Sequence, residues 1–309
     1  MAKSAPPMWR RWVQGARLRT LPLALSPVFL GSSSAVQSGD FSVLFALLAA
    51  LVALALQVGV NYANDYSDGI RGTDDDRVGP LRLVGSGLVE PKQVLRAALL
   101  SFGVAAVSGL VLLIVARVDV LLSEGLIGWF LQVWPVLVLG ALAVLAAWYY
   151  TGGSKPYGYS GAGELVVFIF FGPVATVGTA WVMAGIVPFD AVFSGVGAGA
   201  FASAVLLVNN LRDREKDAAA GKNTLSVRAG YRASLWLLVT LVAVPYVMVG
   251  ILSLFFIWAP VAYITALLTL WVLIQVFLAK KPTQLIGALG ALSMNAIAYG
   301  LVLGIALAW

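Results

Sequence analysis

The feature that most constrains this chain is a series of nine long apolar segments. They lie at about 20–38, 42–64, 94–116, 127–150, 163–185, 189–210, 233–255, 258–278 and 284–308. Each is close to the roughly 20 residues that an α-helix needs to cross a bilayer. The apolar runs are continuous and do not alternate with polar residues, which argues against the strands of a membrane β-barrel. The sequence therefore predicts an all-α, polytopic membrane protein with nine transmembrane helices.

Composition agrees with this fold class and excludes several kinds of chemistry. Of the 309 residues, 61% are hydrophobic and 11% are charged, whereas soluble domains are about 25% charged. The chain contains no Cys and no His, which excludes disulfides, Fe–S clusters, thiolate nucleophiles and a histidine general base. Most zinc, haem and copper sites are excluded as well. Any reaction must therefore use carboxylates, amides, Tyr, Lys, Arg or a hard metal ion.

The distribution of basic residues predicts how the helices are oriented. If the N-terminus is cytoplasmic, every Lys and Arg except Arg117 lies in a cytoplasmic segment, as the positive-inside rule requires. The net charge of +6 therefore reflects topology, and no basic face or motif indicates nucleic-acid binding. Two long polar segments, about 65–93 and 211–232, lie on that same side. We expect one transmembrane domain over residues 1–309, in the cell membrane, with its active site facing the cytoplasm.

Polar residues cluster where the second and sixth spans end. Residues three or four apart share a helix face, so these side chains form two stripes. The first stripe contains Asn61, Asn64, Asp65 and Asp68, and the second contains Asn209, Asp213 and Asp217, flanked by Asn210. Such side chains are costly in a membrane helix unless they face a polar cavity or a cation.

The chemistry of the two stripes indicates a metal. A cluster of oxygen ligands without His or Cys suits Mg²⁺, which leaves coordination positions for phosphate groups. Two facing stripes therefore predict Mg²⁺ ions held around a diphosphate. Either stripe alone is also compatible with an ordinary polar helix end at the level of the lipid headgroups.

Basic residues beside the two stripes fit a diphosphate ligand. Arg77 and Arg82 follow the first stripe, close to the Gly-rich segment 79–87, and Lys222 follows the second. Arg and Lys beside flexible backbone are well suited to bind phosphate oxygens. We predict that Arg82 and Lys222 bind the diphosphate, although each also fits a role as a topology signal alone.

Several motifs resemble the UbiA superfamily of intramembrane prenyltransferases. The segment 64–87 is similar to its first Asp-rich motif, and the segment 209–225 is similar to its second. The segments 149–153 and 157–164 resemble its central loop, and the segment 17–22 fits its N-terminal region. Within the superfamily, these motifs are most similar to the enzymes that prenylate 1,4-dihydroxy-2-naphthoate in menaquinone synthesis.

The resemblance implies an architecture and a set of metal ligands. It implies nine helices around a central cavity, with Mg²⁺ at the Asp-rich motifs and a cleft open to lipid for the prenyl tail. The implied metal ligands are Asn61, Asn64, Asp65, Asp68, Asp213 and Asp217, of which the four aspartates form the catalytic set. The first family motif often has Asp residues four apart, whereas Asp65 and Asp68 are three apart. The choice among the next acids, Asp74, Asp75 and Asp76, therefore stays open.

The implied reaction joins a polyprenyl diphosphate to 1,4-dihydroxy-2-naphthoate, with loss of CO₂ and diphosphate, and gives demethylmenaquinol. Candidate contacts for the aromatic acid are Arg17, Arg19, Lys155 and Glu164. Glu164 begins an apolar span, although an acid at a helix N-terminus is favourable in any case. We expect Asn209 to contact substrate and Tyr149 to face the allylic cation through its ring. Membrane lipid surrounds the protein, and no obligatory protein partner is expected.

Two alternative functions remain compatible with the sequence. A related aromatic prenyltransferase would use 4-hydroxybenzoate or homogentisate in place of the naphthoate. A membrane transporter would share the Gly-rich spans and the acids within them. Transporter acids tend to lie at the membrane midplane, however, whereas these acids lie at helix ends beside basic loops.

Overall fold

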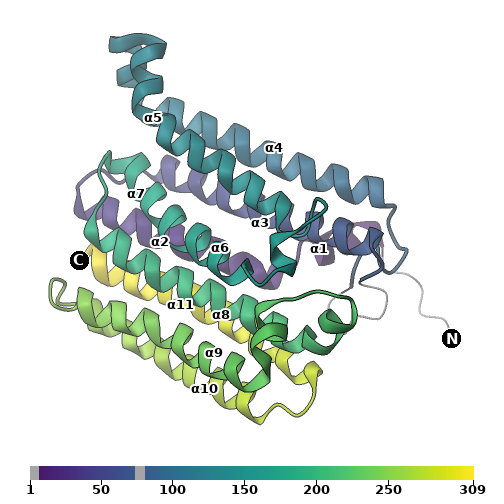
Figure 1. The fold of residues 1–309 in the computed structure, drawn as a ribbon. Helices are drawn as coiled ribbons and strands as arrows, with labels where there is room; N and C mark the ends of the chain where they lie inside the picture. The colour runs from purple at the N-terminus through teal and green to yellow at the C-terminus, as the bar shows by residue number, and fades with distance from the viewer. Residues whose placement is uncertain (1–6, 74–80) are drawn as a thin grey trace.

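The computed structural model describes residues 7–73 and 81–309, and all regular secondary structure within these ranges is helical (Figure 1). In chain order the α-helices are α1 (Met8–Gly15), α2 (Leu21–Gln37), α3 (Val43–Ile70), α4 (Pro91–Ala116), α5 (Val118–Tyr149), α6 (Gly163–Ile169), α7 (Ala175–Ala184), α8 (Phe189–Ala219), α9 (Leu225–Leu252), α10 (Ala266–Leu278) and α11 (Leu285–Ala308). Shorter turns are η1 (Leu18–Thr20), η2 (Tyr157–Tyr159), η3 (Phe170–Val174), η4 (Ala259–Thr265) and η5 (Pro282–Gln284). The predicted all-α class is confirmed.

Each of the nine predicted segments lies on one helix or on a continuous run of helical elements, such as α6, η3 and α7. Helices form here because a chain in lipid must satisfy its own backbone N–H and C=O groups. Within the described ranges, eight helices are long and apolar enough to cross a membrane. The remaining predicted span corresponds to α2, which has 17 residues.

The helix bounds differ from the apolar segments in one informative way. α3 continues to Ile70 and α8 continues to Ala219, so both Asn/Asp stripes lie on helix throughout. Apolarity could not show this, because the last turns of both helices are polar. α5 also begins before its predicted span, at Val118. Its helical backbone is interrupted at Gly125, where φ is 70°, and then continues to Tyr149.

α8 lies at the centre of the bundle. In its most apolar stretch 78% of residues are buried, whereas the corresponding figure for α5 is 6%. α8 packs against α2, α6, α7, α9 and α11. The largest apolar core joins α2, α8 and α11 through buried side chains such as Leu30, Phe201 and Tyr299. The central helix is therefore the one that carries the second stripe.

Small residues allow α6 and η3 to approach α8 closely. A Cβ atom added at Gly199 would lie within 3.0 Å of the Phe168 carbonyl oxygen. One added at Gly172 would lie equally close to the Gly195 carbonyl oxygen. Membrane helices commonly associate through such small residues, because lipid supplies no hydrophobic drive between helices. This contact holds the end of α6 and η3 against α8.

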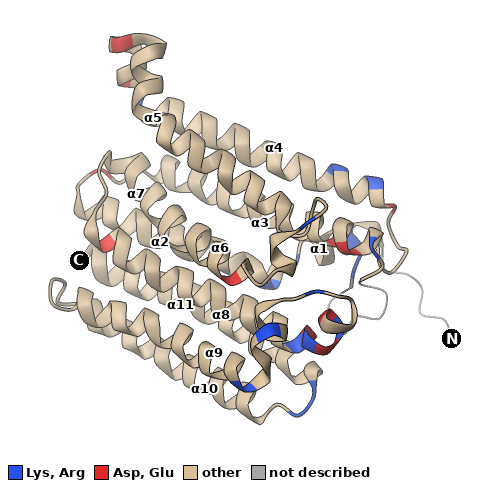
Figure 2. Cartoon of the chain, viewed as in Figure 1, with Lys and Arg blue, Asp and Glu red and all other residues tan. Residues whose placement is uncertain are grey.

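The basic residues other than Arg117, with several acids, gather at one end of the bundle, where α3 and α8 end and where α4, α6, α9 and α11 begin (Figure 2). We refer to this region as the charged end. Arg117 lies at the opposite end, and its guanidinium group donates to the carbonyls of Trp181 and Val182 in the last turn of α7. The Trp181 carbonyl also accepts from the Gly185 backbone N–H at 2.8 Å, so Arg117 adds to the cap at the end of α7. The one basic residue placed outside the predicted cytoplasmic segments therefore has a structural role.

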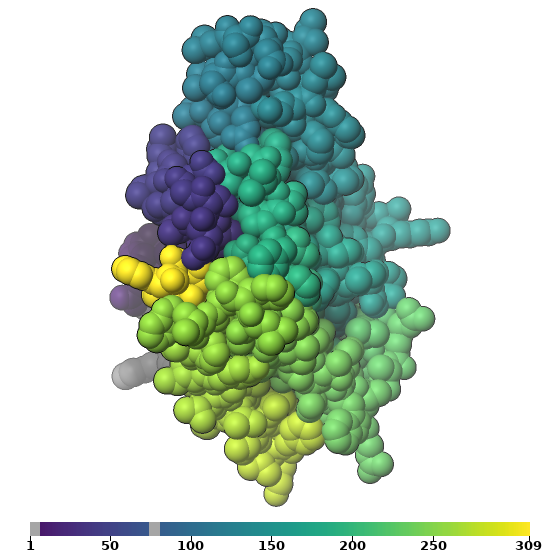
Figure 3. All heavy atoms as spheres, turned by 90° about the vertical axis from the view of Figure 1, so that its left-hand side faces the viewer, coloured from purple at the N-terminus to yellow at the C-terminus, as the bar shows by residue number. Residues whose placement is uncertain are grey.

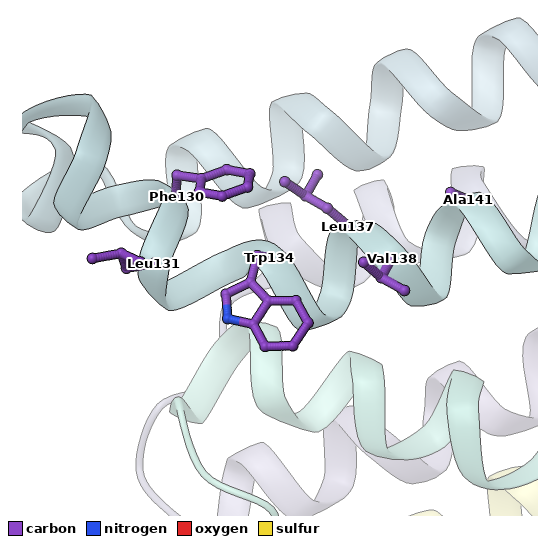
Figure 4. Close-up of a pocket in the computed structure, with 6 residues that line it drawn as sticks. All are labelled: Phe130, Leu131, Trp134, Leu137, Val138 and Ala141. Atoms are coloured by element: carbon purple, nitrogen blue, oxygen red, sulfur yellow. The ribbon is translucent and has the colours of Figure 1, made fainter.

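The hairpin of α4 and α5 lies at the edge of the bundle, and the first turns of α5, before the break at Gly125, project at the opposite end (Figures 1 and 3). A groove of about 470 Å³ runs along α5 (Figure 4). It is lined by Phe130, Leu131, Trp134, Leu137, Val138 and Ala141. These side chains carry no group that could act on a substrate, and a surface of this composition suits contact with lipid.

Replacing Gly199 by Val is expected to destabilise the bundle, because the added side chain has no room beside Phe168 and Gly172. Overpacking costs about 1–3 kcal/mol, so the thermal unfolding midpoint in detergent should fall by several degrees. Gly178→Ala in α7 is the matched control, since a Cβ atom there meets nothing within 4 Å. Equal midpoints for the two variants would contradict this account of the packing.

Candidate active site

A polar cavity of about 160 Å³ lies at the charged end, between α2, α3, α8 and the loops beside them. Its polar lining consists of Arg17, Thr20, Gln57, Asn61, Asn64, Asp68, Arg82, Thr151, Tyr159, Asn209, Asn210, Asp217, Lys222 and Thr224. Its apolar lining includes Tyr150, Val167, Phe171, Val205 and Leu206. Both predicted stripes therefore reach one cavity, although they lie far apart in the sequence.

Asn61 holds the deepest position of the first stripe. Its Nδ2 donates to the Ala16 carbonyl at 2.9 Å and to Thr20 Oγ1 at 3.2 Å. These bonds fix the amide group, and no hydrogen bond from the described residues reaches its Oδ1. Asn61 therefore presents an oxygen to the cavity, ready to bind a cation or a donor.

Asn64 and Asp68 continue the stripe toward the end of α3. Asn64 Oδ1 accepts a hydrogen bond from Thr151 Oγ1 at 2.8 Å. Asp68 accepts one from the Tyr159 hydroxyl and lies 3.2 Å from Lys222 Nζ. Because Asp68 is only 3% exposed, its charge requires such partners.

The Tyr159 hydroxyl stays protonated in this arrangement. Burial raises its pKa, and the nearby Asp68 carboxylate raises the pKa further. The Lys222 ammonium lies 4.5 Å from the centre of the Tyr159 ring, in cation–π contact. Tyr159 thus connects the loop after α5 to both charged groups.

Asp65 faces the loop after residue 80. Its Oδ2 accepts from the Leu83 backbone N–H at 2.8 Å, and its Oδ1 accepts from the Val84 backbone N–H at 2.9 Å. These bonds hold the loop that carries Arg82, which is buried and lines the cavity. Asp65 is not among the described residues that line the cavity.

Arg212 organises the second stripe. Its Nε and Nη2 bind the two carboxylate oxygens of Asp213 at 2.8 and 2.6 Å. Nη2 also donates to Asn209 Oδ1 at 2.8 Å. A bidentate pair of this kind is among the stronger polar interactions in proteins. It holds Asp213 behind the cavity wall, whereas Asn209 and Asp217 reach the wall itself.

Lys222 places a positive charge between carboxylates from the two stripes. Its Nζ lies 3.2 Å from Asp68 Oδ1 and 3.9 Å from Asp217 Oδ1. Its own backbone N–H bonds to the Asp217 carbonyl at 2.8 Å, and the N–H of Asn223 bonds to the Tyr159 carbonyl at 2.8 Å. The loop after α8 is thereby tied across the cavity to the loop after α5.

The oxygen-rich lining fits a hard divalent cation. Asp68 and Asp217 already share the ammonium group of Lys222 as a counter-charge. Gln57 Oε1 is buried and has no hydrogen-bond partner within the described chain. Across residues 7–73 and 81–309, no three acidic side chains meet at one point. A Mg²⁺ ion bound to this lining would therefore also need amide oxygens, water or substrate phosphate, which are ligands it commonly takes.

Arg17 is the one described non-glycine residue with a left-handed backbone, at φ 53° and ψ 62°. It stands at the break between α1 and η1 and lines the cavity. Its Nη2 is buried without a hydrogen-bond partner among the residues described. Strained backbone of this kind tends to persist where function requires a side chain in a given place.

Several predicted site residues lie away from the cavity. Arg19, Tyr149 and Lys155 are exposed at the charged end and are not part of its lining. Glu164 is buried behind Asn210, whose Nδ2 donates to Glu164 Oε1 at 2.9 Å. The candidates Asp74, Asp75, Asp76 and Arg77 lie outside the described residues.

Sequence reasoning assigned no role to Thr151 or Arg212, and it did not single out Tyr159 within its loop. Thr151 and Tyr159 reach the cavity because the loop after α5 folds over the end of α3. Arg71, the residue after α3, holds this loop by donating to the carbonyls of Thr151 and Gly153. Residue spacing could not show this contact, and the resemblance of the loop to a family motif was the only available signal.

Comparison with known proteins places the chain in a family. Residues 24–297 match the UbiA prenyltransferase family. A 1,4-dihydroxy-2-naphthoate octaprenyltransferase from Mycobacterium tuberculosis is 48% identical over 260 residues, which is 84% of each chain. The protein of the same name from Haemophilus influenzae is 33% identical over 305 residues, or 96% of each chain.

Solved structures agree with this assignment at the level of the fold. A UbiA homologue from Archaeoglobus fulgidus bound to GPP and Mg²⁺ has a TM-score of 0.64 at 16% identity, covering 95% of this chain and 99% of that chain. An apo UbiA homologue from Aeropyrum pernix has a TM-score of 0.66 at 16% identity, covering 94% and 97%. The resemblance indicated by the motifs is thus confirmed, and the chain is an integral membrane protein that belongs to the UbiA prenyltransferase family.

Proposed function

We propose that this protein is a Mg²⁺-dependent aromatic polyprenyltransferase that transfers a polyprenyl group to 1,4-dihydroxy-2-naphthoate. The relatives from M. tuberculosis and H. influenzae carry that activity in their names. The observation that carries the proposal is the cavity, because one wall offers carboxylates and cations and the other offers apolar and aromatic side chains. Family membership favours an enzyme over a transporter.

The polar wall is suited to a metal-bound diphosphate. Asp68 and Asp217, with Asn61 and Asn64, would hold Mg²⁺ there. Asp65 and Asp213 belong to the same stripes and complete the proposed set; in this structure Asp65 accepts from loop N–H groups and Asp213 pairs with Arg212. When bound, Mg²⁺ neutralises negative charge that develops on the leaving diphosphate.

The protein's own cations share that role. Lys222 has three N–H donors and contacts two carboxylates, so it retains a donor for a phosphate oxygen. Arg82 is held at the cavity wall by a loop that Asp65 anchors. Asn209 lies beside these groups and contacts the same substrate. Positive charge fixed in advance stabilises the diphosphate as it departs.

The apolar wall protects the reacting carbon. The C–O bond of the donor breaks, and the diphosphate leaves with the electron pair. Tyr150, Val167 and Phe171 exclude water from the allylic cation that remains. A new C–C bond then forms to the aromatic ring, and the ring carboxylate leaves as CO₂ while its bonding electrons stay with the ring. The product is demethylmenaquinol.

Both substrates are anions, and the charged end attracts them. Arg19 and Lys155 are exposed there, where they raise the local concentration of negatively charged substrates. Tyr149 is exposed beside the loop that carries Thr151 and Tyr159. We assign the charged end to the cytoplasmic face of the cell membrane, with residues 1–309 acting as one domain of nine spans.

Removal of the metal should abolish the reaction. Purified protein supplied with polyprenyl diphosphate and 1,4-dihydroxy-2-naphthoate is expected to form demethylmenaquinol only with Mg²⁺, as measured by mass spectrometry. Parallel assays with carboxyl-labelled 4-hydroxybenzoate and homogentisate identify the preferred aromatic acid and record CO₂ release. Full turnover in excess EDTA would contradict the proposal that the reaction requires Mg²⁺.

Asp68→Ala and Asp217→Ala are each expected to lower turnover by at least about 100-fold, because each removes negative charge that the bound cation needs. Asp119→Ala is the matched control, since this acid is exposed at the opposite end of the bundle. The measurement is initial rate at saturating concentrations of both substrates. Near-normal rates for the two cavity variants would show that these carboxylates do not hold the metal.

Because the chain contains no cysteine, single cysteines introduced by mutation can report on which side of the membrane each loop lies. Ser154 is exposed in the loop after α5, and Ser123 is exposed near the opposite end. We expect Ser123→Cys to react with a membrane-impermeant maleimide in intact cells, and Ser154→Cys to react only in inside-out vesicles. The reverse labelling pattern would place the active site on the outer face.

A further inference from the structure

A buried contact behind the cavity wall joins Glu164 in the first turn of α6 to Asn210 on α8. Glu164 is 6% exposed and does not line the cavity, whereas Asn210 does. Asn210 Nδ2 donates to Glu164 Oε1 at 2.9 Å. The backbone carbonyl of Glu164 also accepts from Ser203 Oγ at 2.7 Å, a second bond between α6 and α8 that does not involve the Glu164 side chain. The contact is therefore held on two elements that pack closely through glycine.

This contact decides which end of the Asn210 amide faces the cavity. Only the NH₂ group of an amide can donate to a carboxylate oxygen. With Nδ2 turned toward Glu164, Oδ1 is turned the other way, and no hydrogen bond from the described residues reaches it. The wall at Asn210 consequently presents a hydrogen-bond acceptor to the cavity.

The chemistry of the substrates shows what such an oxygen can bind. Polyprenyl diphosphate has no donor group when ionised, and neither has the carboxylate of the aromatic acid. The ring hydroxyls of the aromatic acid are the donors that remain. The neighbouring lining residues Tyr150, Val167 and Leu206 form an apolar wall suited to a flat ring.

We propose that Asn210 accepts a hydrogen bond from a ring hydroxyl of the aromatic substrate, and that Glu164 is the positioning residue that turns the Asn210 amide for this contact. The proposal rests on the proposed function and names the aromatic subsite within it. Accepting a hydrogen bond from the hydroxyl also leaves more electron density on the ring that attacks the prenyl carbon.

The rival role for the Asn210 oxygen is metal binding. Successive residues on an α-helix point about 100° apart. Asn210 and Asp217 are seven residues apart and so point within about 20° of each other, and what sets Asn210 apart from the second stripe is its bond to Glu164 on α6. Its lining neighbours on the α6 side of the cavity are apolar, which favours the aromatic substrate over the metal.

The experiment measures steady-state kinetics of the full-length protein with Mg²⁺. Asn210→Leu should raise the KM for 1,4-dihydroxy-2-naphthoate about tenfold, the effect of one lost hydrogen bond. The KM for polyprenyl diphosphate and the Mg²⁺ requirement should not change. Glu164→Leu should behave like Asn210→Leu, whereas Glu164→Gln keeps an oxygen that accepts from the amide and should restore nearly the normal KM.

Ser203→Ala is the control for a purely structural effect. It removes the other bond between Glu164 and α8 and lies outside the cavity lining. It should lower the thermal unfolding midpoint and leave the KM for the naphthoate unchanged. A rise in that KM as large as in Asn210→Leu would mean that packing, not the amide oxygen, sets the affinity.

Naphthoates that lack one of the two hydroxyls, used as competitive inhibitors, test the contact directly. Loss of the contacted hydroxyl should weaken inhibition of the wild-type protein about tenfold and make little further difference in Asn210→Leu. Additive losses, or a raised KM for the diphosphate or Mg²⁺ in Asn210→Leu, would overturn the proposal. Failure of the wild-type protein to prenylate the naphthoate would refute the proposed function instead.

Discussion

The arrangement of this protein depends on the cost of charge inside a bundle that lipid surrounds. A carboxylate buried there must have a counter-charge, a hydrogen-bond donor or a cavity. Asp68 meets this requirement through Lys222 and Tyr159, and Asp213 meets it through Arg212. Satisfying these charges draws the loop after α5 and the loop after α8 over the ends of two helices. The cavity is the space enclosed when those loops come together.

The same requirement explains why α8 both has the most buried apolar stretch among the eight long apolar helices and carries the second stripe. Its long apolar part is enclosed by α2, α6, α9 and α11, and its polar end emerges among basic loops. Glycines at the contact with α6 remove side chains that would separate the two helices. Further along the same pair of helices, Ser203 and Asn210 on α8 hydrogen-bond to Glu164 at the start of α6. Packing in the apolar part and hydrogen bonding in the polar part are thus two results of one helix contact.

Much of the fold and part of the site could be predicted from local pattern. Continuous apolar runs located the helices, since membrane helices carry that signal within single segments. Spacing of three and four residues placed Asn61, Asn64 and Asp68 on one face, and all three line the cavity. Basic residues beside flexible backbone extended the prediction to Lys222 and Arg82, which also line the cavity. Helix ends were harder to predict, because the last turns of α3 and α8 are polar and resemble loop.

What the sequence determined by itself is the membrane class, the separation of charge and the two Asn/Asp stripes, because each depends on residues that are near one another in the chain. Tertiary structure alone decided which members of those stripes face the cavity. Asp65 turns to loop N–H groups and Asp213 turns to Arg212, while Arg19 and Lys155 stay exposed. Tyr159 and Thr151 enter the site, and Glu164 lies behind its wall. These outcomes depend on contacts between segments distant in sequence, and the direction of a side chain is set by the partner that compensates its charge.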